Sequence, residues 1–224
     1  MDRLIKPYPL PYLMICGIDE AGRGPVIGPI VIAGVKIDDD NVLRKLQVKD
    51  SKKHSPHRRE VLFKQIVEVV DDYHVVYLKP SEIDEMRKRL TLNQIELRAF
   101  ADLMKILRSD IYYIDAVDVD DERFGEELSK LLPFDAEIIS EHKADEKYPV
   151  VSAASIVAKV KRDAEIRKIA KELEPELGLP LGSGYPADPI TQKFIGEWVD
   201  RFGSLPPHVR RSWKTAKRLL QRKL

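Results

Sequence analysis

Apolar residues recur along the chain with two different spacings. Short apolar or alternating runs bounded by Gly, Pro or polar residues are typical of strands, and apolar positions three or four residues apart are typical of amphipathic helices. The first pattern predicts strands at residues 13–18, 30–37, 73–78, 111–114 and 136–139. The second predicts helices at residues 56–70, 92–107, 124–132, 150–173, 189–202 and 207–220, with Pro175 and Gly178 ending the fourth.

Strands gather early in the chain, then alternate with helices, and the tail is helical. This order predicts an α/β fold with a central mixed β-sheet flanked by helices and a helical C-terminal extension. We divide the chain into an N-terminal arm at residues 1–12, a main domain at 13–174 and a C-terminal region at 175–224. Prolines at alternate positions (Pro7, Pro9 and Pro11) indicate that the arm is extended.

Bulk composition excludes little. The chain has 38 Lys and Arg against 37 Asp and Glu, so any attraction for a polyanion must be local. Cys16 has no cysteine partner in the chain, and a reducing cytoplasm is the default expectation. A run of about 20 apolar residues, which a membrane span needs, is missing from the sequence. The start of the chain also lacks the features of a signal peptide.

The most informative stretch is the sequence from Gly17 to Gly24, where a strand delivers Asp19 and Glu20 to a glycine-rich loop. Neighbouring strand residues point to opposite faces, so both carboxylates can converge only if the strand ends near Asp19. Two acids at a strand end are costly to bury unless they are paired or bind a metal ion. A metal site and a solvated acid pair therefore both remain open.

Two more acids lie where elements meet. Asp115 ends the apolar strand before it, which is where α/β folds place ligand-binding groups, although it could also be a turn or helix-capping residue. Asp145 lies between a strand and the long helix, where an acid often acts only on the helix dipole. We assign Asp118 and the acids that follow it to a solvated loop or helix start. Taken together, acids from separate segments suit Mg²⁺ or Mn²⁺, and two such ions can hydrolyse a phosphodiester.

These motifs, in this order, resemble type 2 ribonuclease H. The resemblance covers about residues 15–217, and the C-terminal stretch at 211–215 resembles the archaeal branch of the family. It rests on the sequences at residues 17–24, 50–52, 113–116, 142–159 and 184–186.

The resemblance implies a ribonuclease H-like catalytic domain and a C-terminal region that helps to bind substrate. It implies that Asp19, Glu20, Asp115 and Asp145 are catalytic and hold Mg²⁺ or Mn²⁺. The loop formed by Gly22, Arg23 and Gly24 would sense the ribose 2′-hydroxyl, helped by Tyr185. Substrates would be RNA/DNA hybrids and duplex DNA with embedded ribonucleotides, cut 5′ to the ribonucleotide to leave 3′-hydroxyl and 5′-phosphate ends in DNA replication and repair.

The same resemblance bears on partners. We expect a monomer. Many archaeal members end in a clamp-docking motif, a Gln followed by a pair of aromatics, and residues 218–224 contain no aromatic residue. Docking on a sliding clamp is therefore an open question.

Local charge adds candidate phosphate contacts. Residues 201–224 contain eight Lys or Arg and no acid, and residues 44–64 contain eight against two acids. A basic run is often only a solvated helix face, but acidic catalytic residues would repel a polyanion without compensating charge. We predict substrate contacts at Lys49, Ser51, Lys52 and Lys214, with Trp213 among the basic residues of the second run.

Two other classes share part of this pattern. A resolvase or transposase on the same fold has strand-end acids, but it has no reason to carry the Gly-Arg-Gly loop with Tyr185. A catalytically silent nucleic-acid-binding module has no reason to keep four acids. Type 3 ribonuclease H is less favoured, because only a short arm precedes the first motif.

Overall fold

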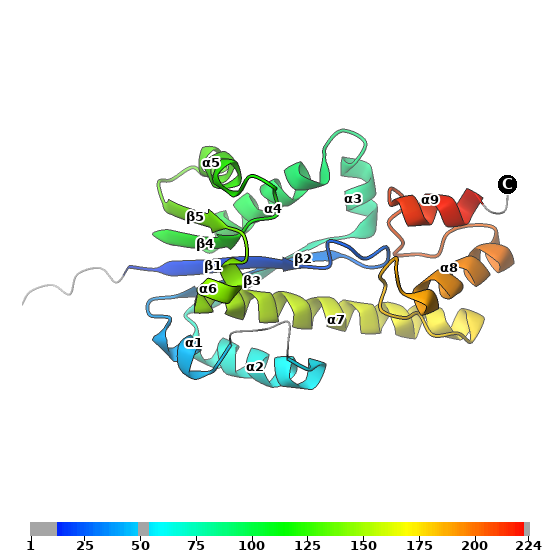
Figure 1. Ribbon diagram of the computed structural model, residues 1–224, viewed down its shortest axis with the longest axis horizontal. Coiled ribbons are helices and arrows are strands. Elements are labelled where there is room, and N and C mark those ends of the chain that lie inside the picture. The colour runs from blue at the N-terminus through cyan, green and yellow to red at the C-terminus, as the bar shows by residue number, and fades with distance from the viewer. Residues whose placement is uncertain (1–12, 49–53, 222–224) are drawn as a thin grey trace, which may run out of the picture.

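A single five-stranded sheet forms the centre of the molecule, in the order β3-β2-β1-β4-β5 (Figure 1). The computed structural model describes residues 13–48 and 54–221. The first three strands in the chain pair antiparallel, and β1, β4 and β5 pair parallel. The mixed sheet is therefore confirmed. Its strands are β1 (Ile15–Ala21), β2 (Ile30–Ile37), β3 (Asp72–Leu78), β4 (Ile111–Asp115) and β5 (Glu137–Glu141).

Helices cover both faces of this sheet and form the end of the molecule that contains the C-terminal residues (Figure 1). None of the helices in the described ranges is long and apolar enough to cross a membrane. The helices are α1 (Asn41–Lys45), α2 (Pro56–Val69), α3 (Pro80–Met86), α4 (Leu92–Ile106), α5 (Asp121–Leu131), α6 (Ala144–Lys147), α7 (Pro149–Leu177), α8 (Pro189–Phe202) and α9 (Lys214–Gln221).

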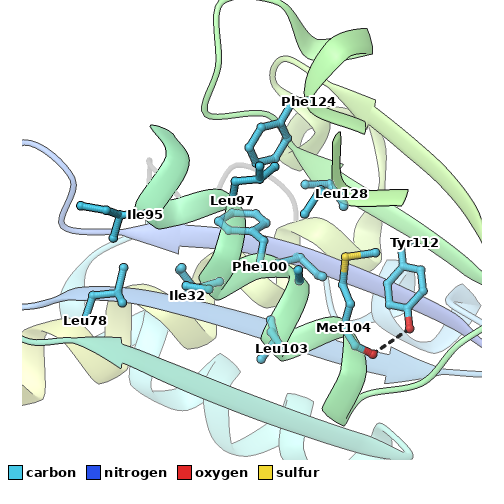
Figure 2. Packing of buried hydrophobic residues seen from close by; sticks show 14 of the residues in the cluster. Ile32, Leu78, Ile95, Leu97, Phe100, Leu103, Met104, Tyr112, Phe124 and Leu128 are labelled. Carbon is cyan, nitrogen blue, oxygen red and sulfur yellow. Dashed lines mark hydrogen bonds between the residues drawn. The ribbon is translucent and has the colours of Figure 1, made fainter. Parts of the chain in front are cut away.

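One face of the sheet packs against α4 and α5 (Figure 2). The rings of Phe100 and Phe124 meet edge to face, with centroids 5.6 Å apart. Buried Tyr112 donates its hydroxyl hydrogen to the carbonyl of Met104 at 3.0 Å, which satisfies its polar tip inside the core. The apolar stripe predicted for residues 92–107 is the surface that makes this core.

The opposite face packs against α7 and α2. At Gly17 of β1, an added Cβ would lie 2.3 Å from the Val150 carbonyl carbon, so only glycine allows the helix to approach this closely. The close approach sets the start of α7 against the strand that carries Asp19. Serines of α7 are thereby available to the acids at the end of β1.

A third apolar cluster belongs to the C-terminal region. It joins the second half of α7 to α8 and α9, and it also takes in Val26 and Ile27 from the loop after β1. Ile27 forms an isolated antiparallel bridge with Val209. The loop that follows the first two acids is therefore packed into the C-terminal region.

Several predicted boundaries are wrong. Strand β1 continues to Ala21, beyond the predicted end near Asp19, because β2 still pairs with it there. Helix α7 passes through Pro175 and ends at Gly178, whose left-handed φ of 67° closes the last turn. The last helix begins at Lys214 and not at residue 207. Short helices α1, α3 and α6 were not predicted, because so few residues show no periodic pattern.

Candidate active site

Three of the four predicted acids converge at the end of the sheet. Asp19 comes from β1, Asp115 from the end of β4 and Asp145 from α6, and each offers a carboxylate oxygen within 4.8 Å of the others. Asp19 and Asp115 are neighbours because β1 and β4 run parallel with Ile18 opposite Ile114. A group of three oxygen donors from three elements is a suitable site for a hard divalent cation.

Neighbouring backbone and hydroxyl groups hold the acids of this trio. The Ala144 amide donates to Asp115 Oδ1 at 3.2 Å, which links the end of β4 to the start of α6. Ser152 Oγ donates to the Asp145 carbonyl oxygen at 2.6 Å and fixes α6 against α7. Ser155, one turn further along α7, hydrogen-bonds the Asp19 carboxylate. The positions of all three acids therefore depend on the packing of α7 against β1.

The electrostatics of the trio favour a cation. Burial raises the pKa of Asp19 well above its ordinary value, and the charges of Glu20 and Asp115 raise it further. The Ser155 hydrogen bond acts in the opposite direction but does not offset these effects. A group that is costly to ionise among like charges becomes easier to ionise when a cation shares its oxygens.

Glu20 lies outside this trio, since it is the next residue on a strand that continues to Ala21. Burial raises the pKa of Glu20 to about 7, and the charges of Glu96 and Asp115 add to the effect. It lines the adjoining cleft. The charge of Glu20 in turn raises the pKa of Asp19, and the role of Glu20 as a fourth metal ligand stays a prediction.

Glu96 is a buried acid that the sequence analysis missed. Its side chain is 0% exposed on α4, and its Oε2 lies 2.7 Å from Nη1 of Arg23. Burial raises the pKa of Glu96 to about 7, although Arg23 and Arg210 act to lower it. A signal existed in the sequence: position 96 shares the apolar stripe of α4 with Phe100 and Leu103, where a charge needs a partner.

A cleft of about 470 Å³ adjoins the acids and contains the predicted recognition loop. Gly22 has φ of +90°, and a Cβ there would lie 2.7 Å from the Pro29 carbonyl oxygen, so the loop requires glycine for its own backbone. A Cβ on Gly24 would lie 3.5 Å from Tyr185 Cε1. The structure therefore places Gly24 and Tyr185 face to face, with Tyr185 45% exposed.

Basic residues of α2 and α7 also line this cleft. Arg59, Lys159 and Arg162 are among them. Arg59 belongs to the basic run at residues 44–64 and Lys159 ends the motif at residues 142–159, whereas Arg162 was not a predicted contact. The guanidinium of Arg162 lies 5.3 Å from the Tyr185 ring centroid and donates to the Ser183 carbonyl at 2.7 Å. It therefore supports both the ring and the turn that carries it. The signal available in sequence was the spacing of Lys159 and Arg162, one helical turn apart, after the acid-bearing segment.

The other predicted substrate contacts divide into two groups. Lys49, Ser51 and Lys52 lie outside the described residues. Lys214 is exposed at the start of α9, so its predicted role stays a prediction. The basic run at residues 201–224 is not one solvated surface, because Arg210 is 0% exposed and stacks 4.8 Å from the Trp213 ring centroid.

A larger hollow of about 1150 Å³ lies between α3, α7 and residues 206–212. None of the four predicted acids lines it, and its walls carry side chains of both charges, such as Lys88, Lys168, Glu165 and Glu172. The smaller cleft beside the acids is therefore the candidate active site.

Comparison with known proteins gives a consistent result. The family model for Ribonuclease HII matches residues 16–216. Ribonuclease HII of Thermococcus onnurineus is 51% identical over 211 residues, which cover 92% of this chain and 90% of that protein. A match of this extent favours Ribonuclease HII over the two alternatives, type 3 ribonuclease H and a resolvase or transposase.

Two solved structures have the same fold. The crystal structure of ribonuclease H2 from Pyrococcus horikoshii superposes with a TM-score of 0.86 at 44% identity, covering 94% of this chain and 98% of that one. A second neighbour is the structure of the PCNA:RNase HII complex from Archaeoglobus fulgidus, with a TM-score of 0.83 at 43% identity, covering 92% and 96%. The ribonuclease H-like fold and the resemblance to the archaeal branch are confirmed. The chain therefore belongs to the ribonuclease HII family of endonucleases.

Proposed function

We propose that this chain hydrolyses the RNA strand of RNA/DNA hybrids and cuts duplex DNA 5′ to embedded ribonucleotides. Family membership supports ribonuclease H activity in general. The observation that carries the finer proposal is the placement of the acid trio beside a cleft in which Gly24 faces Tyr185. Such a cleft offers a place for one sugar next to a place for divalent cations.

The acids fit Mg²⁺ or Mn²⁺. Their donors are all carboxylate oxygens, and the mutual repulsion that raises the pKa of Asp19 is the property that a cation relieves. When bound, a pair of such ions supplies an activated water and stabilises the oxygen that leaves phosphorus. Asp19, Glu20, Asp115 and Asp145 would hold the ions, with Glu20 reaching them from the cleft side. Titration of the metal-free protein with Mn²⁺, followed by electron paramagnetic resonance, tests this without any turnover.

The remaining residues of the cleft would position the substrate. Main-chain groups of the Gly22–Gly24 loop would hydrogen-bond the ribose 2′-hydroxyl, which is the group that distinguishes RNA from DNA at one position. Tyr185 would close the other side of the sugar. Water adds to phosphorus, the bond from phosphorus to the 3′ oxygen of the preceding nucleotide breaks, and that oxygen takes a proton. The products carry a 3′-hydroxyl and a 5′-phosphate.

Partners and location belong to the same proposal. Lys49, Ser51, Lys52 and Lys214 would contact phosphates or sugars of the duplex, and the C-terminal region would help to bind it. We propose a monomer that acts in the cytoplasm during DNA replication and repair. A sliding clamp is a candidate partner, because the Archaeoglobus fulgidus neighbour was solved in complex with PCNA. Size-exclusion chromatography of the chain with and without a trimeric clamp tests both oligomeric state and docking.

One cleavage-mapping experiment tests the activity. A duplex with a single ribonucleotide, the same duplex in all-DNA form and an RNA/DNA hybrid are each incubated with the protein and Mg²⁺ or Mn²⁺. We expect one cut 5′ to the ribonucleotide, many cuts in the hybrid and none in the all-DNA duplex, with Asp115→Asn inactive on all three. Cleavage of the all-DNA duplex would favour a recombinase-like nuclease. Binding without cleavage would favour a silent binding module.

A further inference from the structure

Arg210 is the largest fully buried side chain among the described residues, and it points at the recognition loop. It lies between α8 and α9, in the segment that the sequence analysis predicted to be helical. Its Nη2 donates to the Gly22 carbonyl at 2.6 Å, its Nη1 to the Arg23 carbonyl at 3.0 Å and its Nε to the Gly28 carbonyl at 2.9 Å. One guanidinium thus holds three backbone carbonyls of the segment that follows β1.

These hydrogen bonds fix the orientation of two peptide units. The described chain has no cis peptide bonds, and in a trans peptide the C=O and the N–H point in opposite directions. Because the Gly22 and Arg23 carbonyls face Arg210, the Arg23 and Gly24 amides must point away from it. No residue in the described ranges accepts a hydrogen bond from either amide. Both are therefore donors that point away from Arg210, on a loop whose residues line the cleft.

The side chain of Arg23 has a separate task. Its Nη1 forms the ion pair with Glu96 and donates to the Val117 carbonyl at 2.9 Å, and its Nη2 donates to Asn93 Oδ1 at 2.6 Å. These contacts tie the loop to α4 and to the segment after β4. The side chain is therefore occupied as an anchor, which leaves the main chain of the loop as the group that faces a ligand.

We propose that Arg210 is a positioning residue for ribose recognition. It orients the Arg23 and Gly24 amides as hydrogen-bond donors toward the cleft, so that the C-terminal region contributes to RNA selectivity as well as to duplex binding. The planar fork of a guanidinium can satisfy several carbonyls at once, whereas a lysine ammonium is a single point charge that cannot match this geometry. This inference rests on the proposed function, because the ligand of the two amides is taken to be the 2′-hydroxyl.

The alternative is that Arg210 only stabilises the fold. A structural role and a positioning role can be distinguished by comparing cleavage of the ribonucleotide substrate with the stability of the same variant. A purely structural role predicts that activity follows the folded fraction, as it would for any buried residue of the same region. A positioning role predicts a loss of cleavage in protein that is fully folded at the assay temperature. It also predicts unchanged binding to DNA without a ribonucleotide.

The test uses Arg210→Lys, with Leu219→Ala as the matched control. Leu219 packs in the same C-terminal apolar cluster and has no group that hydrogen-bonds to the loop. Thermal unfolding, equilibrium binding of the all-DNA duplex and single-turnover cleavage of the single-ribonucleotide duplex are measured for parent and variants. We expect Arg210→Lys to cleave about 100-fold more slowly with all-DNA binding unchanged, and Leu219→Ala to cleave like the parent at temperatures where it is folded.

Parent-like cleavage by Arg210→Lys, or an equal loss in Leu219→Ala, would overturn the inference. If Arg210→Lys does not fold, Trp213→Leu removes the ring that stacks on the guanidinium and keeps Arg210 itself. Backbone ¹⁵N order parameters at residues 22–24 should then be lower than in the parent, and unchanged order parameters together with parent-like cleavage would refute the role. If the parent does not cut RNA-containing duplexes at all, the proposed function fails, and the order parameters still decide whether Arg210 orders the loop.

Discussion

Replacing Gly24 by alanine tests where the sugar binds, and the substitution itself should cost the fold little stability. Gly24 has no left-handed backbone angle, and the new methyl group would lie 3.5 and 3.8 Å from Tyr185 Cε1 and Cδ1, which is ordinary van der Waals contact. A compatible Gly→Ala change stabilises a protein by about 0.4–1 kcal/mol, because the unfolded chain loses freedom. At this chain length the midpoint of thermal unfolding should rise by about 1–4 °C.

The expected effect on catalysis has the opposite sign. The methyl group would occupy the space between the loop and Tyr185 in which the proposed ribose lies. A displacement of the substrate by about 1 Å can cost about 100-fold in rate, which corresponds to about 2.7 kcal/mol of lost transition-state stabilisation. We therefore expect a protein that is at least as stable as the parent and about 100-fold slower on a single embedded ribonucleotide.

Two glycine variants serve as controls in the same assay, single-turnover cleavage beside differential scanning calorimetry. Gly196→Ala places its methyl in open space on α8, so it should gain stability and keep full activity. Gly22→Ala should lose about 1–3 kcal/mol of stability, because its φ of +90° is strained for alanine and the Pro29 carbonyl oxygen lies 2.7 Å away. Cleavage by Gly24→Ala within threefold of the parent would refute the placement of the ribose against Tyr185.

Three further predictions concern the acids, the ring and the basic residues. Asp115→Asn should abolish cleavage. It should also raise the unfolding temperature of the metal-free protein at pH 8 by a few degrees, because it removes a negative charge that repels Asp19 and raises its pKa. Calorimetry showing a lower unfolding temperature would contradict this. The fold raises the pKa of Glu20 from 4.5 to about 7, so the contribution of Glu20 to stability is fully present below pH 4.5 and is lost as pH rises through 7. Metal-free protein should therefore be less stable at pH 8 than at pH 5. Added Mn²⁺ should reduce this difference. Tyr185→Ala should slow cleavage of an embedded ribonucleotide far more than it weakens duplex binding, and equal losses would make Tyr185 a turn residue only. Lys214→Ala should lower the slope of log binding constant against log salt by about one, whereas an unchanged slope would mean no phosphate contact.

The sequence predicted the layers of the fold and the acids well, for an identifiable reason. Strand and helix periods are local properties, and so is the presence of an acid at the end of an apolar run. Each of Asp19, Asp115 and Asp145 alone was open to a structural reading, and their convergence depends on the parallel pairing of β1 with β4 and on the packing of α7. The order of the motifs, compared with a known family, supplied the long-range information that local patterns lack.

Other features could not be read from local patterns. The predicted end of β1 near Asp19 assumed that glycines end the strand, but pairing with β2 extends it to Ala21, and Glu20 is not among the three residues whose carboxylate oxygens lie within 4.8 Å of one another. Arg210 stands in a run of basic residues, and nothing nearby in the sequence shows that it turns inward. Its partners are carbonyls of Gly22 and Arg23, 188 and 187 residues earlier in the chain. A charged residue is buried because of such partners, and they are invisible until the chain has folded.

The distance along the chain between Arg210 and the loop also bears on biosynthesis. Protein synthesis proceeds from the N-terminus, so the strands and the acids leave the ribosome before the segment that carries Arg210. A nascent chain that has completed the sheet and α6 already holds Asp19, Asp115 and Asp145, while the carbonyls of Gly22 and Arg23 still lack their guanidinium partner. The recognition loop can therefore take its final order only after residue 210 has been made, and a chain truncated before residue 210 would retain its acids with a loop that is not held in place.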